Sequence, residues 1–479
     1  MPRSPRLLPR DRRAESGGVR TNSPITGKSD NSERAFDRDA DSASFAAKII
    51  PAARQRAGAH PSTRSSRSVV VVGNDAEAAG AGGVSRTADP VAESDRVPFF
   101  SQARTFERLW PVISAKVGEV FDNGKFSHGR QVAELEQRLA EYTGARHVIG
   151  VNSGTDALVL LLRALGIEPG DEVVVPAYSF VSTATSVVLA GGTPVFADID
   201  PDRYALDPDE LARVSGPRTR FAMPAHLFSA MADMSALAQQ ANRLGITLLE
   251  DSAEAIGMRQ CGVHAGLHGA GGVLSFFPSK TLGAIGDAGA VLTDDPAVAD
   301  LVAGLRHHGR FGRTLDHFPG ISTETAACGT NSKMDDVQAA VLLAKLTALD
   351  ADIRRRAELA AQYRDRLAEA PGILRLPEPP AADDAGGRVF YVYLIEVEYR
   401  DELVAHLHQC GIGTETYYPV PLHRQPCFAD GGHARGSFPH AEAAAEHAVA
   451  LPLYPDLDES DVDRVCDAVW DFRLGRLSA

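Results

Sequence analysis

Between residues 147 and 294 the sequence alternates short, continuously apolar segments with amphipathic ones, and this alternation restricts the fold more than any other feature. The apolar segments are predicted strands: HVIGV (147–151), EVVVP (172–176), PVFADI (194–199), RFAMPA (220–225), ITLLED (246–251), GGVLSFF (271–277) and GAVLTD (289–294). Strands that are apolar on both faces are covered on both faces, so we predict an α/β fold with a mostly parallel sheet. In such sheets the ligand binds beyond the carboxyl ends of the strands.

The composition and apolar pattern divide the 479 residues into three regions. Residues 1–95 are rich in Ser, Arg, Ala, Gly and Asp and predict a disordered N-terminal extension; a mis-assigned start codon would give the same composition. We expect a large ligand-binding domain over 96–350. Over 351–479 we expect a linking helix and a smaller α+β domain, and the apolar periodicity of the linking helix runs from about 337 to 367.

Charge and cysteine usage restrict the partners. The net charge is −14, of which residues 1–96 contribute +4 and the remainder −18, and an acidic body argues against nucleic acid as the main partner. The five cysteines are scattered without metal-ligand or redox spacing, which indicates a reducing cytoplasm and no metal. No apolar run approaches the roughly 18 residues of a membrane span, and no apolar segment follows the N-terminal arginines, so neither a membrane span nor a secretion signal is expected.

Two of the strand ends lead directly into predicted helices. NSGTDAL (152–158) presents free backbone N–H groups at a helix start, which suits a phosphate, although the same residues form a good helix cap. PAYSFVSTATS (176–186) places Tyr178 and Phe180 just past a strand. An aromatic ring at that position either covers a planar ligand or packs in the core, and both interpretations stay open on these residues alone.

Two further strand ends carry charged side chains. LLEDSAEA (248–255) puts Glu250 and Asp251 at the rim of the sheet, where Asp251 is either a functional carboxylate or a helix N-cap. SFFPSKTLGAIGDAGAV (275–291) carries Lys280 at a strand end and continues into a glycine-containing loop. Three hypotheses compete for this lysine: it holds a phosphate by charge, it bonds covalently to a carbonyl compound, or it is an ordinary surface lysine.

The position of the glycines decides against a nucleotide-binding loop, because there the glycines precede the lysine, whereas here they follow Lys280. Phe276 and Phe277 are expected to shield Lys280. Burial disfavours the charged form of an amine, so we expect a lowered pKa for Lys280 and a neutral, nucleophilic amine.

Considered together, the four strand ends provide one consistent set of groups. They offer a phosphate cradle, an aromatic ring for stacking, a carboxylate for a protonated ring nitrogen and a lysine for an imine. Pyridoxal 5′-phosphate, a planar phosphorylated aldehyde, needs all four. The sequence therefore predicts pyridoxal phosphate as the cofactor.

The order of these motifs resembles the DegT/DnrJ/EryC1/StrS family of pyridoxal-phosphate sugar aminotransferases. The likeness extends from about 97 to 469 and is carried by NSGTDAL, PAYSFVSTAT, DIDPDRYALDP, AHLFSAMADM, EDSAEAIG, SFFPSKTLGAIGDAGAV, NSKMDDVQAAVL, YYPVPLH and LPLYPDL. The resemblance implies a fold-type I enzyme, with a mostly parallel sheet of the seven-stranded type, that works as a homodimer with active sites shared between subunits.

The resemblance also implies roles for individual residues. Lys280 matches the lysine that bonds to the cofactor and carries the proton. Asp251 matches the partner of the pyridinium nitrogen, and Phe180 matches the stacking aromatic. Gly154, Thr155 and Ser275 match residues that contact the phosphate. Asn331 matches a residue that reaches the phosphate from the partner subunit, and Glu254 matches a neighbour of the cofactor's phenolic oxygen.

The motif YYPVPLH supplies two candidate substrate-binding residues, Tyr417 and His423. The sequence departs from the family pattern at residues 229–231, at Ile256, at Lys333 and at Tyr417 itself. We expect these positions to lie mostly toward the substrate, so they affect the identity of the substrate rather than that of the cofactor. Lys280 argues against the dehydratases of the family, in which histidine replaces the lysine.

The expected function is transfer of an amino group from an amino acid, usually L-glutamate in this family, to a keto-sugar. A nucleotide-activated 3- or 4-keto deoxysugar is the leading hypothesis for the acceptor. A cyclitol or sugar-phosphate aminotransferase is the second hypothesis. A pyridoxal-binding regulator without turnover, with the basic extension on DNA, is the third.

Overall fold

This computed structural model describes residues 96–127, 129–311, 325–378, 387–431 and 435–477, with side chains to residue 472. Contacts divide the chain into Met1–Val71 and Val72–Ala479, and all described residues belong to the second unit. The predicted N-terminal extension, 1–95, lies outside the described residues.

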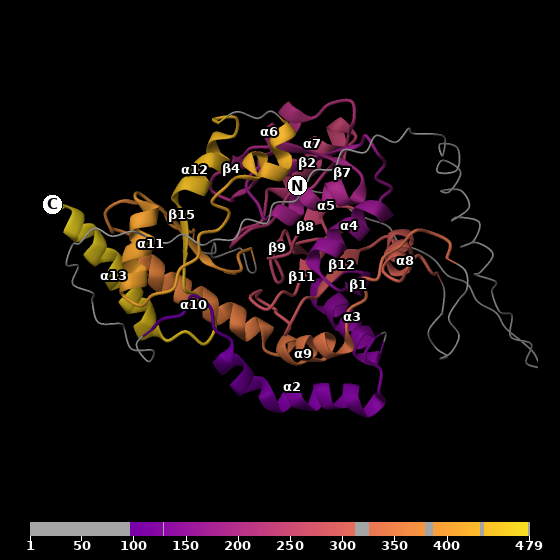
Figure 1. Cartoon of the computed structure of the whole chain (residues 1–479), viewed down its shortest axis with the longest axis horizontal. Coiled ribbons are helices and arrows are strands. Elements are labelled where there is room, and N and C mark those ends of the chain that lie inside the picture. The colour runs from indigo at the N-terminus through magenta and orange to yellow at the C-terminus, as the bar shows by residue number, and fades with distance from the viewer. Residues whose placement is uncertain (1–95, 128, 312–324, 379–386, 432–434, 478–479) are drawn as a thin grey trace, which may run out of the picture. The chain divides into compact units, whose positions relative to one another are not determined.

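The large sheet consists of two four-stranded parts that continue one another (Figure 1). One part has the order β1 (His147–Val151), β12 (Gly289–Thr293), β11 (Gly272–Ser275) and β8 (Glu250–Asp251), and the other has the order β3 (Thr193–Ala197), β2 (Glu172–Pro176), β6 (Thr219–Ala222) and β7 (Thr247–Leu248). Only Leu249 separates β7 from β8, so the two parts share this interrupted strand. Within these parts only β12 runs antiparallel to its neighbours, which confirms the predicted mostly parallel sheet.

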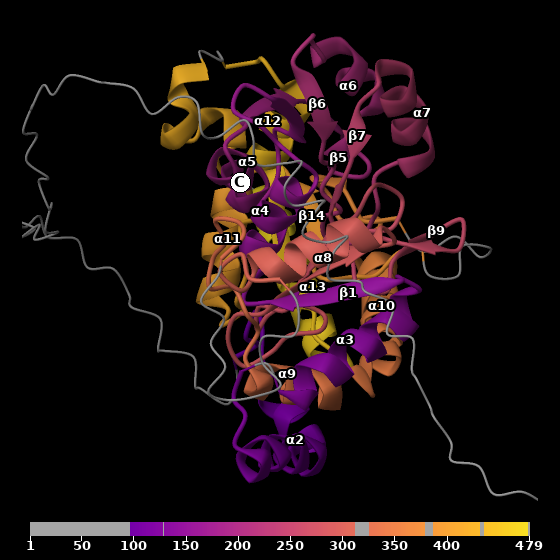
Figure 2. The ribbon, with the colours of Figure 1, turned by 90° about the vertical axis from the view of Figure 1, so that its right-hand side faces the viewer.

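Helices cover both faces of this sheet, as the apolar strands predict. Val173 and Val175 of β2 pack in one core, whereas Val174 between them packs in another, because successive strand residues point to opposite faces. The helices of this region are α3 (Arg130–Thr143), α4 (Gly154–Ala164), α5 (Val181–Ala190), α6 (Pro208–Val214), α7 (Met234–Leu244), α8 (Pro296–Leu305) and α9 (Asp336–Leu346). Figure 2 shows α6 and α7 at one end of the sheet and α3 and α9 at the other.

The predicted helix over 337–367 is instead two helices, α9 and α10 (Leu349–Leu367). Thr347 follows the last residue of α9, and its hydroxyl donates to the carbonyl of Ala344 at 2.7 Å. Threonine side chains that bond to nearby backbone compete with helical hydrogen bonds. The apolar periodicity continues across the break, which is why the pattern alone predicts a single helix.

The C-terminal part has its own antiparallel sheet, in the order β13 (Ile373–Arg375), β14 (Tyr393–Val397) and β15 (Ala448–Leu451). It packs with α10, α11 (Arg400–Gln409) and α13 (Glu459–Leu477) around a separate core. The remaining elements are α2 (Ala103–Asn123), α12 (Pro439–His447), the 3₁₀ turns Leu422–Arg424 and Pro426–Gly431, and the strand pairs β4 (Ile199–Asp200) with β5 (Ala205–Leu206) and β9 (Arg259–Gln260) with β10 (Val263–His264).

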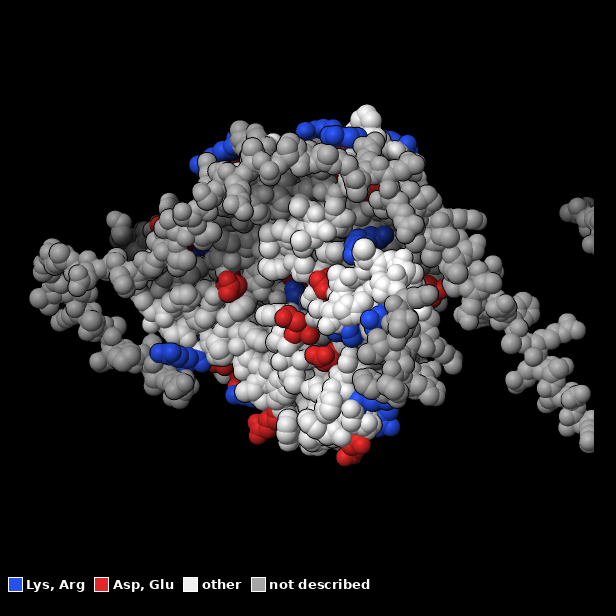
Figure 3. Space-filling view, turned by 45° about the vertical axis from the view of Figure 1, so that its right-hand side comes forward, with Lys and Arg blue, Asp and Glu red and all other residues white. Residues whose placement is uncertain are grey.

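Surface and helix properties bear on the kind of partner. On the face shown in Figure 3, acidic and basic side chains lie in small groups, and its described residues form no continuous basic surface. Among the helices that the structure describes, none is long and apolar enough to cross a membrane. Within the same part of the chain, no group of three or more His, Cys, Asp or Glu residues is placed to hold a metal ion.

Candidate active site

A cavity of about 930 Å³ opens at the carboxyl ends of the sheet strands, where parallel sheets bind ligands. Its lining joins strand ends of the large domain to loops of the C-terminal part. Of the predicted site residues, the following line it: Gly154, Thr155, Phe180, Asp251, Glu254, Ser275, Lys280 and Tyr417. Segments that are distant in sequence therefore meet at one site.

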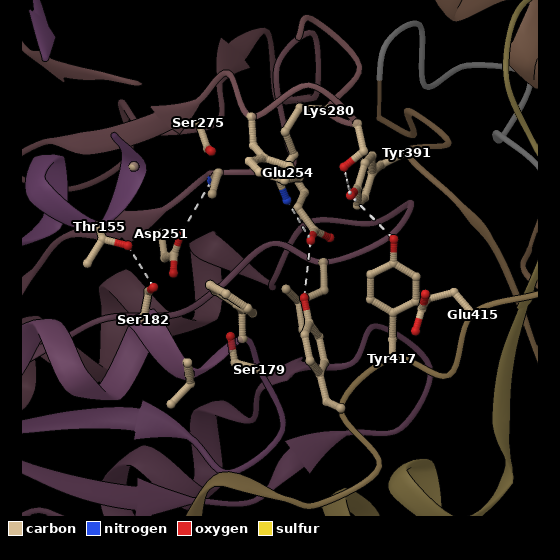
Figure 4. Close-up of a pocket in the computed structure, with 18 of the residues that line it drawn as sticks. Thr155, Ser179, Ser182, Asp251, Glu254, Ser275, Lys280, Tyr391, Glu415 and Tyr417 are labelled. Carbon is tan, nitrogen blue, oxygen red and sulfur yellow. Dashed lines mark hydrogen bonds and ion pairs between the residues drawn. The ribbon is translucent and has the colours of Figure 1, made fainter. Parts of the chain in front are cut away.

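The labelled side chains divide the cavity into two halves (Figure 4). Thr155, Asp251 and Ser275 lie on one side, and Tyr391 and Tyr417 lie on the other. Lys280 and Glu254 lie between these two groups. Residues predicted to contact the phosphate and the ring nitrogen therefore lie on one side of Lys280, and two tyrosines lie on the other.

Lys280 lies at the centre of the site, with its side chain 15% exposed. Its Nζ donates to Oε1 of Glu254 at 3.0 Å and lies 4.4 Å from the centroid of the Tyr391 ring. Burial lowers the pKa of Lys280, but the negative charge of Glu254 and the Tyr391 side chain outweigh it, so the pKa is raised. The predicted lowered pKa is thus wrong for this arrangement, because the sequence pattern did not reveal the ion pair.

Glu254 is buried and receives three hydrogen bonds. The backbone N–H of Phe228 donates to Oε2 at 2.9 Å, and the hydroxyl of Tyr418 donates to Oε1 at 3.2 Å beside Lys280. Both Phe228 and Tyr418 have left-handed backbone conformations, with φ of 61° and 53°, which are uncommon for bulky residues. Such strain concentrates at functional sites, and here it directs two donors toward one carboxylate.

Asp251 ends strand β8, and its carboxylate is buried. Thr183 Oγ1 donates to Oδ2 at 2.7 Å, and the backbone N–H of Ala253 donates to Oδ1 at 3.3 Å. Burial raises the pKa of Asp251, and the two hydrogen bonds oppose this effect only in part. A cationic group beside this carboxylate would compensate for its burial, so Asp251 fits a protonated ring nitrogen.

The adjacent Glu250 serves the fold instead. Its carboxylate accepts hydrogen bonds from His226 Nε2 at 3.0 Å and from the backbone N–H groups of Gly266, His268 and Gly269 at 2.8, 2.6 and 2.9 Å. The two carboxylates therefore have different environments, as expected for neighbouring strand residues that point to opposite faces.

The predicted phosphate cradle is formed by the start of α4 together with Ser275. Gly154 approaches Ser275 so closely that a Cβ on Gly154 would lie 2.9 Å from the serine Cβ, so only glycine fits there. Thr155 Oγ1 bonds to Ser182 Oγ at 2.7 Å. The first backbone N–H groups of a helix attract anions, and both hydroxyls add further hydrogen-bonding groups for a phosphate.

Phe180 precedes α5 and presents its ring to the cavity, with 55% of the residue exposed. An exposed phenylalanine in a cavity lining is available to stack on a planar ring. Tyr178, which the same motif offered, is fully buried in the core, and its hydroxyl donates to the carbonyl of Tyr417 at 3.0 Å. The structure thus shows that Phe180 lines the cavity and Tyr178 packs in the core, a distinction that the motif alone did not make.

Two predicted site residues lie outside this cavity lining. Asn331 is exposed, and its side chain accepts a hydrogen bond from Lys333. His423 is buried against Phe438, and its Nε2 lies 3.2 Å from Oε1 of Glu442. A contact of His423 with substrate is not supported by this position, because the side chain packs inside the protein.

The departures from the family pattern were expected on the substrate side, and for most of them this is wrong. Ser229 and Ala230 line a separate cavity of about 40 Å³. Met231 and Ile256 are buried in the core clusters. Tyr417 is the departure that lines the site, where its hydroxyl donates to that of Tyr391 at 3.3 Å.

The structure adds aromatic residues that the motifs did not indicate. Tyr391 lines the cavity opposite the phosphate cradle, Tyr418 lines it beside Glu254, and Phe99 and Phe100 line it from the segment before α2. Tyr391 lies in the apolar segment VFYVYLIEV (389–397), a pattern that indicates only burial. The one feature of the sequence that could have indicated Tyr418 is its position next to Tyr417. Nothing before the first predicted strand indicated a role for Phe99 or Phe100.

The residues present fit pyridoxal phosphate. The start of α4 beside Ser275 offers backbone N–H groups and hydroxyls for the phosphate, Phe180 offers a ring face, and buried Asp251 offers a carboxylate whose desolvation a protonated ring nitrogen would offset. Lys280 lies between these groups and the open half of the cavity. This fold and this site together define a fold-type I enzyme that depends on pyridoxal 5′-phosphate.

Comparison with known proteins gives the family. Residues 111–470 match the DegT/DnrJ/EryC1/StrS aminotransferase family, and the chain belongs to it. The chain is 40% identical to the dTDP-3-amino-3,4,6-trideoxy-alpha-D-glucose transaminase of Streptomyces venezuelae, over 79% of this chain and 96% of the relative. It is 39% identical to the pleiotropic regulatory protein of Geobacillus stearothermophilus, over 78% of this chain and 98% of the relative.

A solved structure agrees with this assignment. DesV of S. venezuelae, determined in complex with a ketimine intermediate, matches with a TM-score of 0.74 and 39% identity, over 79% of this chain and 98% of the other. The protein is therefore a pyridoxal-phosphate-dependent aminotransferase, as the motifs predicted.

Proposed function

We propose that this aminotransferase moves an amino group from an amino acid, L-glutamate in the first instance, to a nucleotide-activated 3- or 4-keto deoxysugar. The observation that carries the proposal is the division of the cavity, with the cofactor residues in one half and an open, tyrosine-rich half beyond Lys280. The name of the S. venezuelae relative, a transaminase for a dTDP-linked 3-amino trideoxysugar, supports the same class of acceptor.

In this proposal the residues of the chain have separable tasks. Pyridoxal phosphate, when bound, supplies an electron sink for the charge that develops at the substrate carbon. Lys280 moves the proton, because its amine is centred in the cavity and Glu254 lies within hydrogen-bond distance to hold the ammonium form. The hydroxyls of Tyr391 and Tyr417 lie where they can bond to sugar hydroxyls, and Asp251 keeps the ring nitrogen protonated.

Two alternative functions can be distinguished from the proposed one by experiment. A cyclitol or a sugar phosphate would use the same cofactor residues and differ in the open half of the cavity. A regulator without turnover is favoured by the name of the G. stearothermophilus relative. Against it, a regulator has no need of a lysine held for proton transfer, and Lys280 has its partner Glu254 in place.

The experiment is an absorbance assay on purified protein loaded with pyridoxal phosphate. We expect L-glutamate to bleach the visible band of the bound cofactor, and a keto-sugar from a panel of dTDP- and UDP-linked 3- and 4-keto deoxysugars to restore it. Lys280→Ala should show neither change, because the variant lacks the amine that moves the proton. Bleaching without restoration by any nucleotide sugar would reject the proposed acceptor, and a band that glutamate leaves unchanged would favour the regulator.

We also propose a cytoplasmic homodimer with shared sites. Large apolar side chains on and after α2 are exposed, among them Trp110, Phe121 and Phe126 at 58, 64 and 48%, and a second subunit would cover them. Asn331, which the family resemblance assigns to the partner's phosphate, is exposed and lies outside its own cavity lining. The five free cysteines agree with a reducing compartment.

A further inference from the structure

The described chain begins with a short segment that crosses from the C-terminal part to the active site, and we call residues 97–102 the strap. Val97 is buried, and its backbone pairs with the turn after α11: its N–H donates to the carbonyl of Gly411 at 3.0 Å, and its carbonyl accepts from Gly413 at 2.8 Å. The strap therefore starts from a fixed position.

Gly413 shows how closely the strap is packed. A Cβ placed on Gly413 would lie 2.5 Å from the backbone nitrogen of Phe99 and 3.2 Å from its Cβ. Contacts below 3.0 Å with backbone force one of the two segments to move. The absence of a side chain at residue 413 thus sets the position of Phe99.

The far end of the strap is attached to the catalytic loop. Gln102 Nε2 donates to the carbonyl of Pro278, two residues before Lys280. Between the two attachments, Phe99 and Phe100 line the cavity. The ring of Phe99 lies 6.4 Å from that of Tyr417, on the half of the cavity opposite Thr155 and Asp251.

We propose that the strap is part of the acceptor-binding site, in which Phe99 and Phe100 form an aromatic wall against the C–H face of the sugar ring. Aromatic faces pack well against apolar surface, and each deoxy position of a sugar replaces a hydroxyl with C–H groups. The strap thereby favours deoxysugars over fully hydroxylated ones. This inference rests on the proposed function. It assigns a role in acceptor specificity to a segment that neither holds the cofactor nor takes part in the reaction with the amino donor.

The test separates the two half-reactions of the loaded enzyme in single turnovers. The donor half-reaction is followed as bleaching by L-glutamate, and the acceptor half-reaction as recovery of the band with the keto-sugar of the panel that the wild type accepts. For Phe99→Ala we expect a loss of about tenfold or more in the acceptor rate at subsaturating sugar, with the donor rate within about twofold of wild type, because the wall contacts only the larger substrate.

Gly413→Ala is the second variant, because it displaces Phe99 without removing its ring, and we expect the same selective loss. Gly216→Ala is its matched control: Gly216 is exposed just after α6, and a Cβ there would meet only Glu172 Oε2 at 3.8 Å, an ordinary contact, so both half-reactions should stay unchanged. An equal loss in both half-reactions, or no loss in either, would overturn the inference. If the wild type bleaches with glutamate and accepts no sugar of the panel, the proposed function fails first and the inference falls with it.

Discussion

At the scale of single residues, the ion pair between Lys280 and Glu254 controls the reactivity of the lysine. An amine must be neutral to attack a carbonyl, and it must also hold a proton part of the time in order to transfer it. Burial favours the neutral form, whereas the carboxylate at 3.0 Å and the Tyr391 side chain favour the charged one. The pKa of Lys280 is therefore raised, because Glu254 together with Tyr391 and Asp251 outweighs the effect of burial.

Glu254→Gln tests this balance. Replacement keeps the size of the side chain and removes its charge, so the pKa of Lys280 should fall and the neutral amine should be present at lower pH. We expect the pH dependence of the rate at which added pyridoxal phosphate joins to Lys280 to move toward acid in the variant. The measurement follows the visible absorbance of the cofactor after mixing with cofactor-free protein across pH.

A second carboxylate of the cavity provides the comparison. Asp287 lines the cavity and forms no described contact with Lys280, so Asp287→Asn removes the same charge without removing the ion pair. Equal acid shifts in both variants would mean that general field effects, rather than the contact with Glu254, set the reactivity of Lys280.

At the scale of elements, α9 supports the loop that follows Lys280. Lys345 of α9 is buried, and its Nζ donates to the carbonyl of Gly283 at 2.6 Å. Gln338 of the same helix accepts from the backbone N–H of Ile285 at 3.0 Å. These contacts explain why a loop with several glycines can hold Lys280 in one place.

Burial lowers the pKa of Lys345 to about 8, with Asp352 and Asp456 opposing this effect and Arg356 and Arg108 adding to it. Between about pH 8 and 10.5 the unfolded chain holds this proton and the folded protein does not, so stability rises with pH there. Relative to Lys345→Met, the wild-type free energy of unfolding should therefore increase by on the order of 2 to 3 kcal/mol over this interval.

Urea unfolding at steps from pH 7 to 10 measures this difference. Lys125→Met serves as the control, since Lys125 is exposed, and its difference from wild type should be nearly flat with pH. A Lys345→Met difference that stays constant or falls with rising pH would show that the folded state does not depress the proton affinity of Lys345.

At the scale of the whole molecule, the proposed homodimer explains why one predicted cofactor residue lies outside the cavity. Asn331 is exposed and paired with Lys333, away from the lining of its own site. If it completes the site of the partner, each active site contains Lys280 of one subunit and Asn331 of the other.

Mixed dimers test this arrangement. Lys280→Ala and Asn331→Ala should each be strongly impaired, because one lacks the proposed proton carrier and the other lacks the proposed phosphate contact. After the two variants are dissociated, mixed in equal amounts and reassociated, random pairing gives about a quarter of all sites with both native residues. We expect activity to recover to about that fraction. Recovery is not expected when either variant is treated alone, and its absence in the mixture would place Asn331 in its own subunit's site.

Features that arise from residues near one another along the chain are predictable from the sequence, whereas features that arise from contacts between distant segments are not. The residues predicted to hold the cofactor stand at strand ends that the apolar segments mark, and parallel strands bring their carboxyl ends together. Tyr391, by contrast, reaches Lys280 from the C-terminal part, and its segment carried only the pattern of a buried strand. The helix break after α9 was missed because a single threonine hydroxyl changes the backbone without changing the apolar period.

By itself, the sequence determined the sheet, the cofactor and the family, because each depends on short motifs whose residues act near one another along the chain. Only the tertiary structure decided the proton affinity of Lys280, the burial of His423 and the position of the strap against the catalytic loop. These properties depend on tertiary contacts between separate segments, or on the sum of burial and opposing charge at one atom. Neither leaves a periodic signal in the sequence.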